Sequence, residues 1–281
     1  MSRPRIAVLT LVAMLAFAGN SLLCRAALQG TGIDPATFTA LRVASGALAL
    51  WLIVRARDGG RVERAGGWPS ALALFAYAAA FSFAYVELTA ATGALLLFGA
   101  VQATMIGVGL QRGERLRPWQ WLGLATALGG LVGLLLPGIS APPLAGATLM
   151  IGAGVAWGVY SLRGKGRGDP LRVTAGNFLR AVAFAAALSL VMLASASVDP
   201  LGVLLALTSG AITSGVGYAV WYTVLPRLRA TSAATVQLSV PVLAAVGGTA
   251  LLGEAPTLRL VLASAAVLGG IAMVIVEKRP P

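Results

Sequence analysis

The chain has 281 residues, of which 58% are hydrophobic and only 11% are charged. Soluble domains carry about 25% charged residues, so this composition excludes an ordinary water-soluble fold. The net charge of +12 would suit nucleic acid, but the basic residues lie in short segments between apolar runs, which excludes a continuous nucleic-acid-binding face.

Ten segments are long and apolar enough to cross a membrane, because a spanning helix needs about 20 mostly apolar residues. In chain order they cover residues 6–27, 36–54, 68–88, 92–110, 118–136, 143–162, 171–194, 203–224, 231–252 and 258–276. We therefore expect an all-α integral membrane protein with ten transmembrane helices, surrounded by the lipid bilayer. Nothing is left over for a soluble domain.

The basic residues predict how these helices are oriented. Cationic loops stay on the cytoplasmic side of a membrane, and 17 of the 21 lysines and arginines lie at the termini or in alternate loops. The intervening loops, such as 137–143 and 253–257, contain no lysine or arginine. We therefore expect both termini to be cytoplasmic.

The chain is also a duplication. Residues 113–136 and 253–276 read as two copies of one segment, 140 positions apart, and each copy starts with a Gly-Glu pair and contains a Gly-Gly pair. This divides the chain into five-helix repeats at 1–140 and 141–281. Because five is an odd number, the second repeat must cross the membrane inverted relative to the first. The opposite charge of the two Gly-Glu loops indicates the same inversion.

These repeats resemble the EamA branch of the drug/metabolite transporter superfamily. Besides the Gly-Glu and Gly-Gly pairs, the resemblance includes Leu41-Arg42, Leu179-Arg180 and Pro241. It covers the whole chain, and within the superfamily the chain is most similar to the YddG-type aromatic amino acid exporters of bacterial inner membranes. The resemblance implies a multi-pass inner-membrane transporter that works by alternating access. One departure is Val101, which stands opposite Pro241, so a proline hinge is absent from the first repeat.

Aromatic residues near the middle of several segments are the first candidates for a binding site. Rings that line a central cavity would hold a flat apolar solute by stacking, at about 0.5–1.5 kcal/mol per pair beyond burial. The alternative is ordinary packing or an aromatic belt at the membrane surface. The aromatic candidates for the substrate site are Phe17, Tyr77, Phe81, Trp157, Tyr160 and Tyr218.

Polar side chains inside the spans are the second set of candidates for the binding site. Asn20, Gln102 and Gln237 must face protein or water, because an unpaired amide in hydrocarbon costs several kcal/mol. They either bind the polar groups of a substrate or hold neighbouring helices together. Arg42 and Arg180 lie nearer helix ends, so we expect them to bind backbone carbonyls or reach the interface rather than a substrate.

These observations favour export of small metabolites, above all aromatic or other apolar amino acids, around a central cavity. The alternative is an exporter of drugs or cationic compounds of the same superfamily. No carboxylate lies in the first span, which argues against cation exchange, and a non-transport membrane protein is the third class. No nucleotide fingerprint, nucleophile constellation or histidine is present, so we expect neither an enzyme nor a cofactor or metal. The sequence leaves the oligomeric state open and is compatible with a monomer.

Overall fold

The computed structural model describes residues 1–58, 65–113, 115–138, 140–164, 168–228, 233 and 236–275, and these residues form helices and no strands. The helices are α1 (Arg3–Gly30), α2 (Pro35–Asp58), α3 (Trp68–Tyr85), α4 (Ala90–Gln111), α5 (Pro118–Leu135), α6 (Leu144–Gly164), α7 (Pro170–Val191), η2 (Leu193–Ser195), α8 (Pro200–Thr208), η3 (Ser209–Val216), α9 (Gly217–Val224), η4 (Leu225–Arg227), α11 (Ser239–Leu252) and α12 (Leu258–Ile275).

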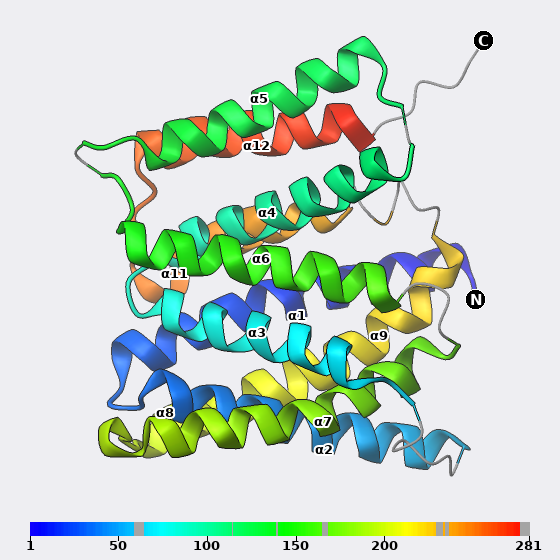
Figure 1. Ribbon diagram of the computed structural model, residues 1–281, viewed down its shortest axis with the longest axis vertical. Helices are drawn as coiled ribbons and strands as arrows, with labels where there is room; N and C mark the ends of the chain where they lie inside the picture. Colours follow the sequence, from blue (N-terminus) through cyan, green and yellow to red (C-terminus); the bar gives the residue numbers. More distant parts are fainter. Residues whose placement is uncertain are drawn as a thin grey trace.

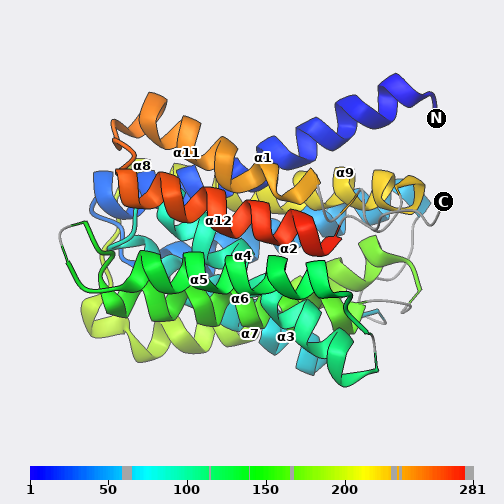
Figure 2. The same ribbon diagram turned by 90° about the horizontal axis from the view of Figure 1, so that it is seen from above.

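The helices lie side by side as a bundle (Figures 1 and 2). Within the described residues, eight helices are long and apolar enough to cross a membrane, with Pro200–Arg227 counted as one, and α11 is a shorter apolar helix. The start of α1 and the end of α12 lie at the same end of the bundle (Figure 1). The chain is therefore an all-helical, multi-pass membrane protein.

Two expected spans differ in detail from the structure. The eighth is not one regular α-helix, because η3 is a wider π-helical segment inserted between α8 and α9. In the ninth, the regular helix α11 begins at Ser239 rather than 231, and residues 231, 232, 234 and 235 lie outside the described part. Pro241 lies in the first turn of α11, where a proline has no intrahelical hydrogen bond to lose.

The last helices of the two repeats pack against each other through small residues. A Cβ atom added at Gly123 of α5 would lie 2.6 Å from the carbonyl oxygen of Gly270 in α12. A Cβ atom at Gly130 would lie 3.2 Å from the carbonyl oxygen of Ala263. The later residue of α5 thus meets the earlier residue of α12, so the two helices run antiparallel. They lie together at one edge of the bundle (Figure 1).

The helix contacts described here come in pairs that are related by exchanging the two repeats. Helix α1 contacts α11 and α6 contacts α4, while α2 contacts η3 and α7 contacts α3. Each second pair is the first with the repeats exchanged. The same exchange turns the Gly123–Gly270 contact into the contact of Gly130 with Ala263, because both partners move by 140 positions. This pattern is what a two-fold axis between the repeats produces.

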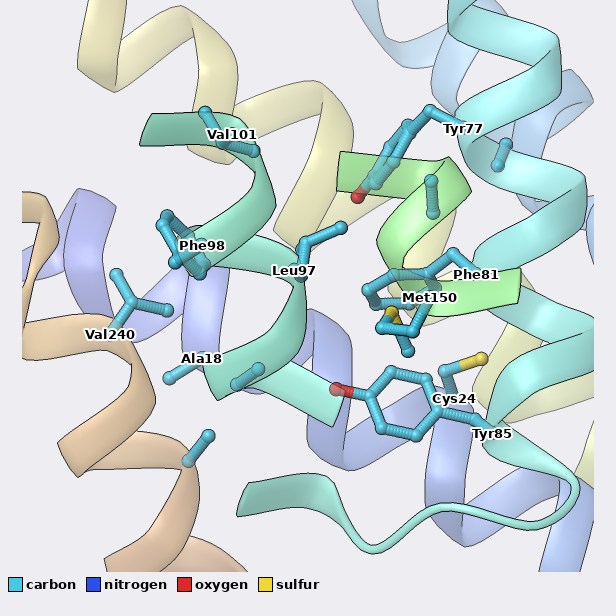
Figure 3. Packing of buried hydrophobic residues seen from close by; sticks show 14 of the residues in the cluster. Ala18, Cys24, Tyr77, Phe81, Tyr85, Leu97, Phe98, Val101, Met150 and Val240 are labelled. Atoms are coloured by element: carbon cyan, nitrogen blue, oxygen red, sulfur yellow. The ribbon is translucent and has the colours of Figure 1, made fainter. Parts of the chain in front are cut away.

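The buried core runs through the middle of the bundle and includes one side of α3. Tyr77, Phe81 and Tyr85 are spaced four residues apart, so they project from the same face of the helix. Figure 3 shows them beside Met150 of α6. Each of these three residues is at most 5% exposed.

The closest contact between helices joins α2 and the π-helical segment η3. A Cβ atom added at Gly210 would lie 2.1 Å from the carbonyl oxygen of Arg42 and 2.0 Å from the hydroxyl oxygen of Ser45. A Cβ atom at Gly46 would in turn lie 3.1 Å from the carbonyl oxygen of Gly210. Glycine at these positions lets the two backbones touch, which fixes the position of Arg42 relative to η3.

We predict that Gly210→Ala separates α2 from η3 and lowers the stability of the protein by roughly 1–3 kcal/mol, the usual cost of overpacking. Gly152→Ala is the matched control, because a Cβ atom there has no neighbour within 4 Å. Thermal unfolding in detergent, followed by circular dichroism, should give a lower midpoint for the first variant only. Equal midpoints would contradict the close contact.

Candidate functional site

Aromatic rings from both repeats meet at the centre of the bundle. The ring of Trp157 in α6 lies 4.8 Å from Tyr77 in α3 and 5.4 Å from Tyr218 in α9, centroid to centroid. Phe17 of α1 contacts Tyr218 at 5.7 Å with its ring turned by 69°. These distances and angles fall within the favourable range for aromatic pairs. The four rings form one continuous cluster, which we call the aromatic cluster.

Two further predicted residues extend the aromatic cluster. Phe81 lies 5.4 Å from Tyr77, one helical turn along α3, and Tyr160 lies 5.3 Å from Trp157, almost one turn along α6. The hydroxyl of Tyr160 is hydrogen-bonded to Thr174 at 3.3 Å and accepts from the amide of Asn177 at 3.4 Å. Tyr160 is therefore held by α7, at the side of the cluster away from Phe17.

A chain of hydrogen bonds connects the cluster to the π-helical segment. Ser209 and Thr213 lie four residues apart in η3. The hydroxyl of Ser209 donates to Oδ1 of Asn20 at 2.7 Å, whereas the single hydroxyl hydrogen of Thr213 goes to the carbonyl oxygen of Ser209 at 2.7 Å and leaves the Thr213 oxygen 3.4 Å from Oδ1 of Asn20. Because Oδ1 accepts the bond from Ser209, the other end of the amide is the donor, and Nδ2 of Asn20 donates to the hydroxyl oxygen of Tyr77 at 3.2 Å. Asn20 thus links α1, α3 and η3.

Arg42 reaches the same hydroxyl from α2. Its Nη2 donates to the hydroxyl oxygen of Tyr77 at 2.9 Å, and its guanidinium carbon lies 5.2 Å from the ring centroid of Tyr77 and 4.7 Å from that of Phe81. Only 2% of the residue is exposed. The expectation that this arginine binds carbonyls or reaches the interface is therefore wrong.

The same expectation is confirmed for Arg180. Its Nη1 donates to the carbonyl oxygen of Ala65 at 2.7 Å and to that of Gly176 at 2.9 Å. Each arginine follows a leucine in the second helix of its repeat. Arg180 donates hydrogen bonds to loop and helix carbonyls, whereas Arg42 contacts the aromatic cluster. Their different surroundings break the symmetry of the two repeats.

The two predicted glutamines stand apart from the other seven candidates. Gln102 is buried in α4 and Gln237 is half-buried just before α11. Among the described residues, no hydrogen bond or ring contact joins either side chain to the aromatic cluster. Their assignment to a substrate site stays a prediction.

Sequence reasoning missed three residues that the structure places beside the predicted ones, namely Arg42, Ser209 and Thr213. For Arg42 a signal was available, because seven residues separate it from the start of α2 at Pro35. At 1.5 Å per residue this is about 10 Å into the helix, too deep for an arginine at the membrane surface. No signal marks Ser209 and Thr213, since the π-helical turns that direct them toward Asn20 arise from packing against α2.

One end of the bundle is closed by ties between the repeats. Nε of Arg25 in α1 contacts Oε1 of Glu254 at 2.8 Å, and Oε2 of Glu254 accepts from the backbone nitrogen of Ala90 at 2.8 Å. At the same end Oδ2 of Asp34 accepts from the backbone nitrogen of Ser197 at 2.9 Å. Partial burial opposes the ionisation of Asp34, but hydrogen bonds from Thr37, Ser197 and Ala36 outweigh it and lower the pKa of this carboxyl. These ties lie at the end opposite the start of α1 (Figure 1).

The aromatic cluster carries groups of the kinds that stack and form hydrogen bonds. Among the described residues, no group of three or more histidine, cysteine, aspartate or glutamate side chains gathers to hold a metal ion. The rings offer flat apolar faces, and the arginine, tyrosine and asparagine offer N–H and O–H groups.

Comparison with known proteins identifies the family. Residues 4–136 and 144–276 each match the model of the EamA-like transporter family. An uncharacterized protein of Pseudomonas aeruginosa, PA1977, is 59% identical over 274 residues, which cover 98% of this chain and 96% of that protein. The threonine/homoserine exporter RhtA of Salmonella typhimurium is 34% identical over 161 residues, 54% of this chain and 53% of the exporter.

A solved crystal structure agrees in fold. It superposes with a TM-score of 0.67 over 97% of this chain and 98% of the other, at 24% sequence identity. The tandem family match covers nearly the whole sequence and coincides with the two repeats found from the 140-residue offset. Members of this family are transporters, not enzymes. The chain belongs to the EamA-like transporter family.

Proposed function

We propose that the protein exports amino acids with aromatic or other apolar side chains across the bacterial inner membrane by alternating access. The observation that carries the proposal is the aromatic cluster, to which Phe17 and Tyr77 come from the first repeat and Trp157 and Tyr218 from the second. A site built from both repeats is the arrangement that transporters with internal repeats use. Because the repeats hold it between them, their relative movement would expose it to either side.

The architecture we propose is ten transmembrane helices in two inverted repeats, residues 1–140 and 141–281. The antiparallel packing of α5 on α12 and the exchanged contacts around Gly123 and Gly130 support it. The first turn of α5 contains Gln120 between two tryptophans, and the helix lies along the apolar α12, which supports a span through the same layer.

We further propose that both termini face the cytoplasm. Arg57, Arg163 and Arg227 lie in or after the last turns of helices that end where α1 begins, and Arg112 follows the end of α4 there. The opposite end contains loops without lysine or arginine. A basic end facing the cytoplasm follows from the positive-inside rule.

We predict different accessibility for two cysteines introduced at exposed positions in a Cys24→Ala background. A membrane-impermeant maleimide added to intact cells should label Ser140→Cys, in the loop before α6, and leave Ser2→Cys unlabelled until the cells are opened. Labelling of Ser2→Cys alone in intact cells would reverse the proposed orientation.

Alternating access requires that each end of the bundle can close. The Arg25–Glu254 pair supports closure of one end, because it joins α1 to the turn between α11 and α12 while Arg25 also donates to the carbonyl of Tyr85 at 3.0 Å. The 140-residue offset that relates Glu254 to Glu114 also relates Arg25 to Lys165. Glu114 and Lys165 lie outside the described residues.

Breaking the Arg25–Glu254 pair should open the end that it closes. Cys24 is a native reporter, because it is fully buried next to Arg25. We predict that Arg25→Gln raises the rate at which a soluble maleimide modifies Cys24, and that the Arg25→Glu/Glu254→Arg exchange restores slow labelling. Arg259→Gln, at the same end but outside the pair, serves as control. A rate unchanged by Arg25→Gln would argue against this closure.

The substrate class follows from the rings. Four aromatic side chains in mutual contact present faces that stack on a flat side chain, and the relative RhtA exports amino acids, threonine and homoserine, by its name. A cationic drug would meet the guanidinium of Arg42 beside these rings, and no buried carboxylate of the described residues stands there to attract it. The drug-exporter alternative is therefore disfavoured.

We predict that Trp157→Ala weakens the binding of phenylalanine and tryptophan by roughly 5- to 150-fold, equivalent to about 1–3 kcal/mol for one lost stacking ring. Trp121→Ala, on the exposed face of α5, should have no effect. Efflux of labelled amino acids from proteoliposomes containing equal amounts of each variant measures the difference. Transport by Trp157→Ala at the parental rate would remove the aromatic cluster as the site.

A further inference from the structure

The guanidinium of Arg42 has binding capacity that the protein does not use. A guanidinium carries five N–H donors in a planar fork. Nη2 donates to Tyr77, whereas Nη1 is buried and has no hydrogen-bond partner. A buried donor without a partner costs about 1–3 kcal/mol, and more when it is charged. The site is therefore incomplete as it stands.

The charge of Arg42 is also unbalanced. The acidic side chains that the structure describes with partners bind elsewhere, Glu254 to Arg25, Glu87 to the backbone of Gly146, and Asp169 to Arg57. No ion pair involves Arg42 among the described residues, and besides the hydroxyl of Tyr77 its guanidinium faces the rings of Tyr77 and Phe81. These rings attract the cation by about 0.5–2 kcal/mol, which leaves a net positive charge in the apolar interior.

The hydrogen bonds around Arg42 all run in one direction. Ser209 donates to Asn20, and Asn20 and Arg42 both donate to the hydroxyl oxygen of Tyr77. A tyrosine oxygen has two acceptor positions, so both are occupied, and the hydroxyl hydrogen of Tyr77 remains to be donated. Nη1 of Arg42 and the hydroxyl of Tyr77 are therefore two donors that have no acceptor in the described hydrogen bonds.

We propose that Arg42 and Tyr77 form the receptor for the carboxylate of the transported molecule, an assignment that rests on the proposed function of the aromatic cluster. A carboxylate has two oxygens that accept the Nη1 hydrogen of Arg42 and the hydroxyl hydrogen of Tyr77 together, and arginine binds this planar group with two parallel bonds. Trp157, 4.8 Å from the ring of Tyr77, then stacks on the apolar part of the same molecule.

Arg180 shows that an arginine inside this fold does not need a ligand. It follows a leucine in its repeat as Arg42 does, and it donates to the carbonyls of Ala65 and Gly176. The 140-residue offset places Arg42 two residues from the position equivalent to Arg180, and Arg42 donates to no carbonyl in the described hydrogen bonds. An arginine that only stabilised the fold could bind carbonyls as Arg180 does, but Arg42 does not bind them in the described hydrogen bonds.

Three aromatic probes separate the carboxylate from the amine: phenylalanine, 3-phenylpropionate, which has only the carboxylate, and phenethylamine, which has only the amine. Calorimetric titration of the purified full-length protein should give dissociation constants for the two carboxylates at least about tenfold lower than for phenethylamine. Arg42→Gln should weaken both carboxylates by roughly 10- to 100-fold and leave phenethylamine unchanged. Arg180→Gln is the matched control and should bind like the parent.

The wild-type comparison decides the question even where Arg42→Gln fails to fold. Equal affinity for 3-phenylpropionate and phenethylamine, no binding of either carboxylate, or full affinity in a folded Arg42→Gln variant would overturn the carboxylate receptor. Efflux of phenylalanine from proteoliposomes tests the proposed function separately. Transport without carboxylate selectivity refutes the receptor but not export, whereas Arg42-dependent carboxylate binding without transport refutes export but not the receptor.

Discussion

The burial of a guanidinium between two aromatic rings is the constraint on which the centre of this structure depends. Placing an arginine inside a membrane costs about 2.5–3.5 kcal/mol or more, and Arg42 is 2% exposed without a carboxylate partner in the described residues. Its surroundings reduce this cost through the rings of Tyr77 and Phe81 and the hydroxyl of Tyr77. The backbone contact of Gly210 with Arg42 and the wider turns of η3 hold α2 in the place that makes these contacts.

The duplication explains why the binding site that we propose lies at the centre. Residues brought together from α1, α3, α6 and α9 come from both repeats, so the aromatic cluster lies at the boundary across which the repeats would move. Contacts far from the centre serve packing instead, as between α5 and α12, where glycines let two backbones approach. The two repeats differ in symmetry at Arg42 and Arg180, because Arg42 of the first repeat contacts the aromatic cluster and Arg180 of the second binds carbonyls.

Much of this could be predicted from the sequence, because hydropathy and the 140-residue offset act over whole helices. The family and the helical class followed from the repeated motifs and from hydropathy. Matched positions and spacing selected Phe17, Tyr77, Trp157 and Tyr218, which the structure connects ring to ring, whereas their place in a substrate cavity stays a prediction. The π-helical segment did not, because its extra backbone width depends on glycine contacts with α2 that no local pattern reveals. The contacts of Arg42 with Tyr77 and Phe81 were missed because the arginine was taken to lie near a helix end, although it is two turns inside α2.

An experimental structure of the protein with bound phenylalanine tests the central claim most directly, because it locates the molecule without relying on any variant. The account predicts the phenyl ring against Trp157 and Tyr218, with the carboxylate within hydrogen-bond distance of Nη1 of Arg42 and the hydroxyl of Tyr77. Density for phenylalanine elsewhere, such as the apolar crevice lined by Gly99, Leu131 and Val267 between α4, α5 and α12, would contradict it.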